Sequence, residues 1–121
     1  MVRYKADQGD LIWLDFDPQT GHEQRGRRPA LVVSNNDANS FLDPMAMVCP
    51  ITSTDRGYPT RVKLNGTELT GFVMCEQMRS IDLSARNAEF AEKLPPDLMC
   101  EVADILYSMI EITGSLTDIS H

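Results

Sequence analysis

Residues 9–34 read GDLIWLDFDPQTGHEQRGRRPALVVS. Two apolar segments, residues 11–16 and residues 30–33, enclose a polar segment that contains two glycines and three arginines. Short runs rich in Leu, Ile, Trp and Val are typical of β-strands, so we predict two strands joined by a polar loop at residues 17–29. So long a loop in a chain of 121 residues is usually functional or mobile.

Further short strands are predicted after this pair. Residues 45–51, 60–64 and 72–78 are apolar or alternating, and turn-forming residues separate them. Asn65-Gly66 directly follows the second of these segments and is a typical hairpin turn. Many short strands with frequent turns favour a small barrel or a sandwich.

The C-terminal segment instead has the period of a helix. Pro95, Pro96 and Asp97 are typical of a helix start, and Gly114 is typical of a helix end. Between them, apolar residues recur at steps of three and four: Leu98, Val102, Ile105, Leu106, Met109 and Ile112. A shorter helix is predicted at residues 86–93. The expected fold is therefore mainly β with α, in a single domain spanning residues 1–121.

The charge distribution bears on the class of partner. The net charge is −7, which by itself disfavours a nucleic-acid ligand. Residues 87–121, however, hold seven acidic residues and one basic residue, a balance of −6, so residues 1–86 are nearly neutral. The sequence shows neither an apolar run of about 18 residues nor a signal peptide, and we therefore expect a cytoplasmic protein.

The sequence lacks the common catalytic motifs. It contains no Gly-rich phosphate loop, HExxH motif or nucleophile elbow, and its cysteines and histidines have no metal-ligand spacing. We therefore expect no metal and no cofactor. The polar loop is the remaining candidate, because Arg25, Arg27 and Arg28 can bind phosphates while Glu23 and Gln24 can bind bases or ribose. The alternative is a solvated loop with a chance cluster of charges.

Several collinear motifs strengthen the functional interpretation. GDLIWLDFDP at residues 9–18, GHEQ at residues 21–24 and RPALVVS at residues 28–34 resemble the N-terminal signature of the MazF/PemK toxin family. CPITS at residues 49–53, GYP at residues 57–59 and EQMRSID at residues 76–82 resemble later segments of that family in the same order.

This resemblance implies a fold, a reaction and partners. The family fold is a small SH3-like β-barrel with a C-terminal helix. Family members are homodimers that cleave single-stranded RNA, including mRNA, at short sequences without a metal, leaving a cyclic phosphate and a free 5′ hydroxyl. A cognate antitoxin with an acidic, disordered tail inhibits them. Homodimerisation, an RNA substrate and an antitoxin partner are thus expected here, with no membrane association.

The resemblance also assigns residues. Arg28 matches the family's catalytic arginine, and Thr52 matches its catalytic threonine. Glu23 is a candidate general base on chemical grounds alone. The positions that match RNA contacts in the family are His22, Glu23, Gln24, Asn35, Ser53, Glu76 and Gln77. Arg25 and Arg27 are expected to add phosphate contacts.

Other interpretations remain open. Arg28 could hold the loop by an ion pair, Thr52 could be an ordinary hydroxyl at a strand end, and His22 could be an exposed loop residue. At the level of the whole chain, the alternatives are a toxin of the same fold that poisons DNA gyrase and a non-catalytic SH3-like binding module. Peptide-binding modules of that kind use aromatic grooves, and only 7% of this chain is aromatic.

Overall fold

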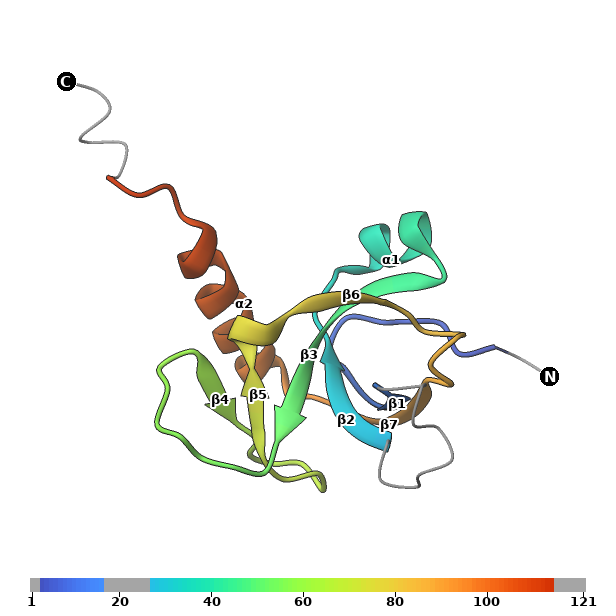
Figure 1. The fold of residues 1–121 in the computed structure, drawn as a ribbon, viewed down its shortest axis with the longest axis horizontal. Coiled ribbons are helices and arrows are strands. Elements are labelled where there is room, and N and C mark those ends of the chain that lie inside the picture. Colours follow the sequence, from blue (N-terminus) through green and yellow to red (C-terminus); the bar gives the residue numbers. More distant parts are fainter. Residues whose placement is uncertain (1–2, 17–26, 115–121) are drawn as a thin grey trace.

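The computed structural model describes residues 3–16 and 27–114. Within these described residues, seven strands form one antiparallel sheet: β1 (Asp10–Asp15), β2 (Arg27–Val32), β3 (Met45–Thr52), β4 (Arg61–Lys63), β5 (Phe72–Met74), β6 (Arg79–Asp82) and β7 (Glu89–Lys93). Two α-helices, α1 (Asn36–Leu42) and α2 (Pro96–Ile110), and a 3₁₀ turn, η3 (Cys75–Gln77), complete these elements. The expectation of a mainly β fold with a C-terminal helix is confirmed (Figure 1).

The sheet follows the order β4-β5-β3-β2-β1-β7, and β6 pairs with β3 outside this path. The long strand β3 is therefore shared, since its first half pairs with β6 and its last two residues pair with β5. Over the described residues, β4 and β7 end the path without pairing with each other, so the SH3-like barrel is not closed.

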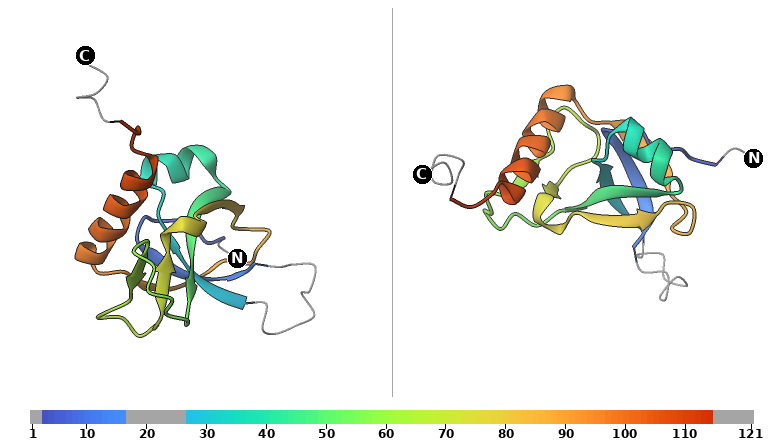
Figure 2. Two further views of the ribbon diagram at one scale, coloured as in Figure 1. Left: turned by 60° about the vertical axis from the view of Figure 1, so that its left-hand side comes forward. Right: turned by 90° about the horizontal axis from the view of Figure 1, so that it is seen from above.

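Apolar side chains cover both faces of this sheet. One cluster, which includes Leu11, Leu31 and Ile51, packs against Val102 of α2. A second cluster contains Ile12, Leu14, Val32 and Val48 among its members. Because neighbouring residues of one strand point to opposite faces, strands buried on both sides need consecutive apolar residues such as Leu31-Val32. Helix α2 lies beside β4 and η3 (Figures 1 and 2).

Several sequence-based expectations need correction. Residues 86–93 do not form a helix, because residues 89–93 are strand β7, which pairs with β1. Strand β1 would otherwise leave one side of its backbone unpaired, and this pairing outweighs the local helical pattern. Residues 27–29, expected in the polar loop, belong to β2 and pair with residues 13–15. Residues 75–77, expected in a strand, form η3 instead.

The remaining corrections concern turns and helix ends. The β4–β5 hairpin is present, but it closes through residues 64–71 rather than through Asn65-Gly66 alone. Glu92 of β7 accepts hydrogen bonds from the backbone N–H groups of Glu68 and Leu69 at 3.1 and 2.7 Å, which stabilises this longer loop. Helix α2 ends at Ile110, before Gly114, so Ile112 lies outside it and is exposed. Helix α1 was not predicted.

The apolar cluster that contains Leu11 and packs against α2 is expected to stabilise the fold. A substitution of Leu11 tests this expectation. Its side chain is fully buried, and Leu11→Ala is expected to lower the free energy of unfolding by about 2–5 kcal/mol. Leu42→Ala is the matched control, because Leu42 at the end of α1 is 38% exposed and should cost about 1 kcal/mol or less. Urea unfolding at one fixed protein concentration measures both. Equal losses would contradict the proposed position of the core.

Candidate active site

Arg28 and Thr52 come together at one end of the β2–β3 pair. These strands pair as Ala30 with Pro50 and Leu31 with Cys49, so the residue numbers of each pair sum to 80. Arg28 lies two residues before Ala30, and Thr52 lies two residues after Pro50, so both lie just beyond the paired part of β2 and β3. Both residues line a pocket of about 430 Å³. The two residues predicted from the sequence lie 24 positions apart in the chain and line one pocket.

Several of the residues that line this pocket carry hydroxyl groups. Its other lining residues are Arg27, Pro29, Ile51, Ser53, Thr54 and Thr70. The Thr52 hydroxyl accepts a hydrogen bond from the backbone N–H of Thr54 at 3.2 Å, which holds the turn after β3. The sequence analysis missed Thr54 and Thr70. The available signal was the hydroxyl-rich run Thr52-Ser53-Thr54.

Gly71 allows β5 to approach Thr52 closely. Its φ is +129°, and a Cβ atom placed there would lie 2.6 Å from the carbonyl oxygen of Thr52. Any side chain at this position would push β5 away from the end of β3. Gly71 therefore helps to define the shape of the pocket on the side of Thr70.

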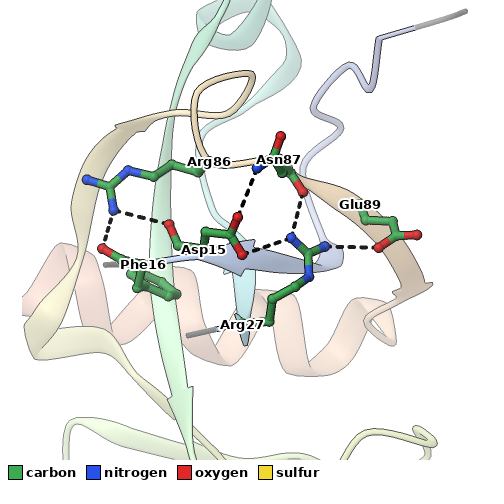
Figure 3. A network of polar contacts seen from close by, with 6 residues as sticks. All are labelled: Asp15, Phe16, Arg27, Arg86, Asn87 and Glu89. Carbon is green, nitrogen blue, oxygen red and sulfur yellow. Dashed lines mark hydrogen bonds and ion pairs between the residues drawn. The ribbon is translucent and has the colours of Figure 1, made fainter. Parts of the chain in front are cut away.

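Arg27, the neighbour of Arg28, is bound on three sides (Figure 3). Its guanidinium donates to Oδ1 of Asp15 at 3.1 Å, to Oε1 of Glu89 at 2.9 Å and to the carbonyl oxygen of Asn87 at 3.1 Å. The other carboxylate oxygen of Asp15 accepts from the Asn87 side chain at 2.9 Å. Arg27 thus forms ion pairs with two carboxylates, those of Asp15 and Glu89.

Arg28 differs from Arg27 in its surroundings. Within residues 3–16 and 27–114 no carboxylate forms an ion pair with Arg28, and its side chain is exposed at the pocket. An arginine in such a position supplies fixed positive charge and several N–H donors for a phosphate.

Three predicted RNA-contact residues lie away from this pocket. Asn35 follows the opposite end of β2, and its side chain accepts from the Ala38 N–H at 2.9 Å as the N-cap of α1. Glu76 forms an ion pair with Arg61 at 2.7 Å and accepts from the Thr60 hydroxyl at 2.7 Å. Gln77 is exposed on η3. Their roles stay predictions.

The surroundings of Glu76 act on its charge. Burial raises its pKa, but the hydrogen bonds from Arg61 and Thr60 outweigh this effect and hold the pKa below its usual value. The guanidinium of Arg61 also stacks on the ring of Tyr58, 4.5 Å from its centre. Glu76 is thus a fixed anion at the surface, where it can accept hydrogen bonds from a ligand.

His22, Glu23, Gln24 and Arg25 lie outside the described residues, and their roles stay predictions. Among the residues that are described, no group of three or more His, Cys, Asp or Glu side chains is placed to hold a metal ion. The described helices include none that is long and apolar enough to cross a membrane.

The family model for PemK-like, MazF-like toxins of type II toxin–antitoxin systems matches residues 7–110. The endoribonuclease toxin MazF of Escherichia coli strain K12 is 42% identical over 95 residues, covering 78% of this chain and 85% of that protein. Endoribonuclease PemK of Escherichia coli is 33% identical over 117 residues, covering 91% and 87%.

Solved structures agree with these matches. The MazE–MazF crystal structure (Form-II) from Deinococcus radiodurans superposes with a TM-score of 0.77 at 37% identity, covering 92% of this chain and all of the other. MazF (Form-I) from the same organism gives a TM-score of 0.76 at 41% identity, with coverages of 89% and 98%. The chain belongs to the family of PemK-like, MazF-like toxins of type II toxin–antitoxin systems.

The ion pair of Asp15 predicts a pH dependence of stability. Hydrogen bonds from Asn87 and Arg27 outweigh burial and hold the pKa of Asp15 below its ordinary value of 3.8. The folded pKa is depressed, so this carboxylate stabilises the fold above its ordinary pKa, and the contribution is lost as pH falls through the depressed value. Asp15→Asn should therefore unfold more easily than wild type at neutral pH.

Urea unfolding of both proteins from about pH 7 to about pH 2 measures this difference. The difference in the free energy of unfolding between wild type and Asp15→Asn is expected to stay constant down to about pH 4 and then to shrink. A gap that persists unchanged at the lowest pH would mean that the substitution acts through packing rather than through charge.

Proposed function

We propose that this chain is an endoribonuclease toxin that cleaves single-stranded RNA, including mRNA, at short specific sequences without a metal ion. The observation that carries the proposal is the placement of Arg28 and Thr52 in one pocket, just beyond the residues that pair β2 with β3. Relatives named as endoribonucleases, at 42% and 33% identity over most of the chain, support the reaction.

The chemistry begins at the ribose. Its 2′ oxygen attacks the adjacent phosphorus and loses its proton, while the bond from phosphorus to the 5′ oxygen breaks and that oxygen gains a proton. The products are a 2′,3′-cyclic phosphate and a free 5′ hydroxyl. Negative charge grows on the non-bridging phosphate oxygens in the transition state, and a pre-positioned guanidinium stabilises this charge.

Each proposed side chain has a distinct part in this reaction. Arg28 donates to the phosphate oxygens and supplies the positive charge that a metal ion supplies in many other nucleases. Thr52 donates its hydroxyl to the same oxygens. Glu23 is proposed as the base that takes the 2′ proton. The remaining predicted contact residues, His22, Gln24, Arg25, Asn35, Ser53, Glu76 and Gln77, are proposed to bind bases and the RNA backbone.

The direct test is to incubate the pure protein with a long single-stranded RNA in excess chelator. Discrete fragments that end in a cyclic phosphate are expected, and mapping their ends gives the cleavage sequence. Activity that disappears in chelator and returns with a divalent ion would exclude the metal-free reaction. If no RNA is cleaved while DNA gyrase is inhibited, the gyrase-poisoning alternative is correct.

Two substitutions test the assigned roles. Arg28→Ala and Thr52→Ala are each expected to slow cleavage about 100- to 1000-fold, the usual effect of removing one pre-positioned donor. Arg3→Ala is the charge-matched control, because Arg3 is exposed and pairs with Asp43 next to the far end of β3. Thr52→Ser keeps the hydroxyl and should keep most activity. Near-normal cleavage by a folded Arg28→Ala protein would contradict the proposal.

A homodimer is proposed as the active assembly. Exposed apolar side chains near the end of α2, including Tyr107, Ile110 and Ile112, support it, since such surface is usually buried in a partner. Light scattering at micromolar concentration should give twice the mass of the 13.6 kDa chain. A stable monomer under these conditions would contradict this part of the proposal.

A cognate antitoxin is proposed as the inhibitor, acting with the toxin in the cytoplasm. The MazE–MazF complex from Deinococcus radiodurans, in which the related chain is 37% identical, supports this partner. Arg25, Arg27 and Arg28 form a dense basic cluster in the sequence, and an acidic, disordered segment of the antitoxin is suited to this surface. Antitoxin and RNA are then expected to compete.

Titrating a non-cleavable RNA against the toxin–antitoxin complex tests the competition. RNA should displace the antitoxin, and salt should weaken antitoxin binding because the contacts are between charges. Simultaneous binding of both ligands with undiminished affinity would place the inhibitor elsewhere, for example on α2.

A further inference from the structure

The end of β1 and the start of β2 both contact the turn between β6 and β7, at Arg86 and Asn87. At the end of β1, the backbone N–H of Asp15 donates to the carbonyl oxygen of Arg86 at 2.9 Å. The Arg86 guanidinium donates in return to the carbonyl oxygens of Asp15, at 3.2 Å, and of Phe16. Figure 3 shows the two contacts of the Arg86 guanidinium on one side of the network.

Arg27 makes the corresponding contacts at the start of β2. Its guanidinium joins Asp15 of β1, Asn87 of the turn and Glu89 of β7. Asn87 has a φ of +54°, in the left-handed region that asparagine tolerates better than most residues. Its carbonyl group accepts from Arg27, and its side-chain amide donates to Asp15.

The Arg27–Asp15 pair is partly buried, so solvent screens it less than it screens an exposed ion pair. The side chains of Arg27 and Asp15 are 32% and 26% exposed, whereas the Glu89 side chain is 73% exposed. A guanidinium that donates to three acceptors has little freedom to rotate, because each bond restricts the same rigid group. Asp15 and Asn87 thus restrict the Arg27 guanidinium more than the exposed Glu89 does.

The alternation of a strand connects this network to the pocket. Successive side chains of a strand point to opposite sides, so Arg27 and Arg28 leave the backbone of β2 in opposite directions. Arg27 also lines the pocket, but its guanidinium is bound to Asp15, Asn87 and Glu89. Arg28 lies on the other side of the strand and lines the same pocket with Thr52.

We infer that Arg27 is a positioning residue, which together with Asp15 and Asn87 holds the start of β2 so that Arg28 faces the phosphate beside Thr52. This inference rests on the proposed RNA cleavage. It assigns Arg27 a role different from the phosphate contact that its charge alone indicates.

A phosphate contact and a positioning role of Arg27 predict opposite effects of a substitution at its acidic partner, Asp15. If Arg27 only attracts phosphate, Asp15→Asn removes a nearby negative charge and RNA should bind as well or better. If Arg27 positions Arg28, Asp15→Asn loosens the network and slows the chemical step. A misplacement of about 1 Å at a reacting group can cost up to about 100-fold in rate.

The experiment compares Arg27→Gln, Arg27→Lys and Asp15→Asn, with Arg3→Gln as the control that breaks the exposed Arg3–Asp43 pair. For the first three variants, kcat is expected to fall about 10- to 100-fold while KM stays within about twofold of wild type. Arg27→Lys should not restore kcat, because a single ammonium nitrogen cannot replace the two guanidinium nitrogens that bind these three acceptors. Arg3→Gln should cleave like wild type. Thermal unfolding confirms that each variant is folded at the assay temperature.

Normal kcat with raised KM in Arg27→Gln, together with full activity of Arg27→Lys and Asp15→Asn, would show a phosphate contact and overturn the inference. A second readout does not depend on activity. The NMR order parameter of the Arg28 N–H should fall from about 0.85 toward about 0.6 in Asp15→Asn and remain unchanged in Arg3→Gln. If wild type cleaves no RNA, the proposed function fails, and this measurement still decides whether Arg27 and Asp15 order Arg28. An unchanged order parameter in Asp15→Asn would overturn the inference.

Discussion

The pairing of β3 with three other strands is the constraint on which the rest of the structure depends. One strand is hydrogen-bonded to β2, β5 and β6, so its register sets the position of most of the sheet. Val48 and Ile51 of β3 belong to the two different apolar clusters, so both cores also meet on it. A shift by one residue would exchange the faces of every side chain on the strand, and burial on both sides penalises such a shift strongly.

The candidate site lies where this strand ends. Thr52 is the last residue of β3, and the chain leaves the sheet there through a run of hydroxyl residues. Strand ends combine a rigid backbone on one side with accessible side chains on the other. The hydroxyl and guanidinium groups are thereby held on a rigid sheet and still reach a ligand in solvent.

The acidity of the chain does not extend to this pocket. Asp97, Glu101 and Asp104 are exposed on α2, and no residue of α2 lines the pocket. No acidic residue is among the described residues that line the pocket. A net charge of −7 is thus compatible with a local site that binds an anionic backbone. The net charge by itself disfavours a nucleic-acid ligand, and only its distribution along the chain removes this objection.

The sequence by itself determined the mainly β class of the fold and the C-terminal helix, and it singled out Arg28 and Thr52 as candidates, because apolar periodicity and ordered motifs are local signals. The tertiary structure alone decided that residues 89–93 form a strand, since the unpaired side of β1 required a partner from far along the chain. It also decided that Arg27 binds Asp15 and Asn87, which lie 12 and 60 positions away. Two adjacent arginines look equivalent in a sequence. Both line the pocket, and only the strand pairing, which brings Arg27 to acceptors of β1, β7 and the turn before β7, separates their roles.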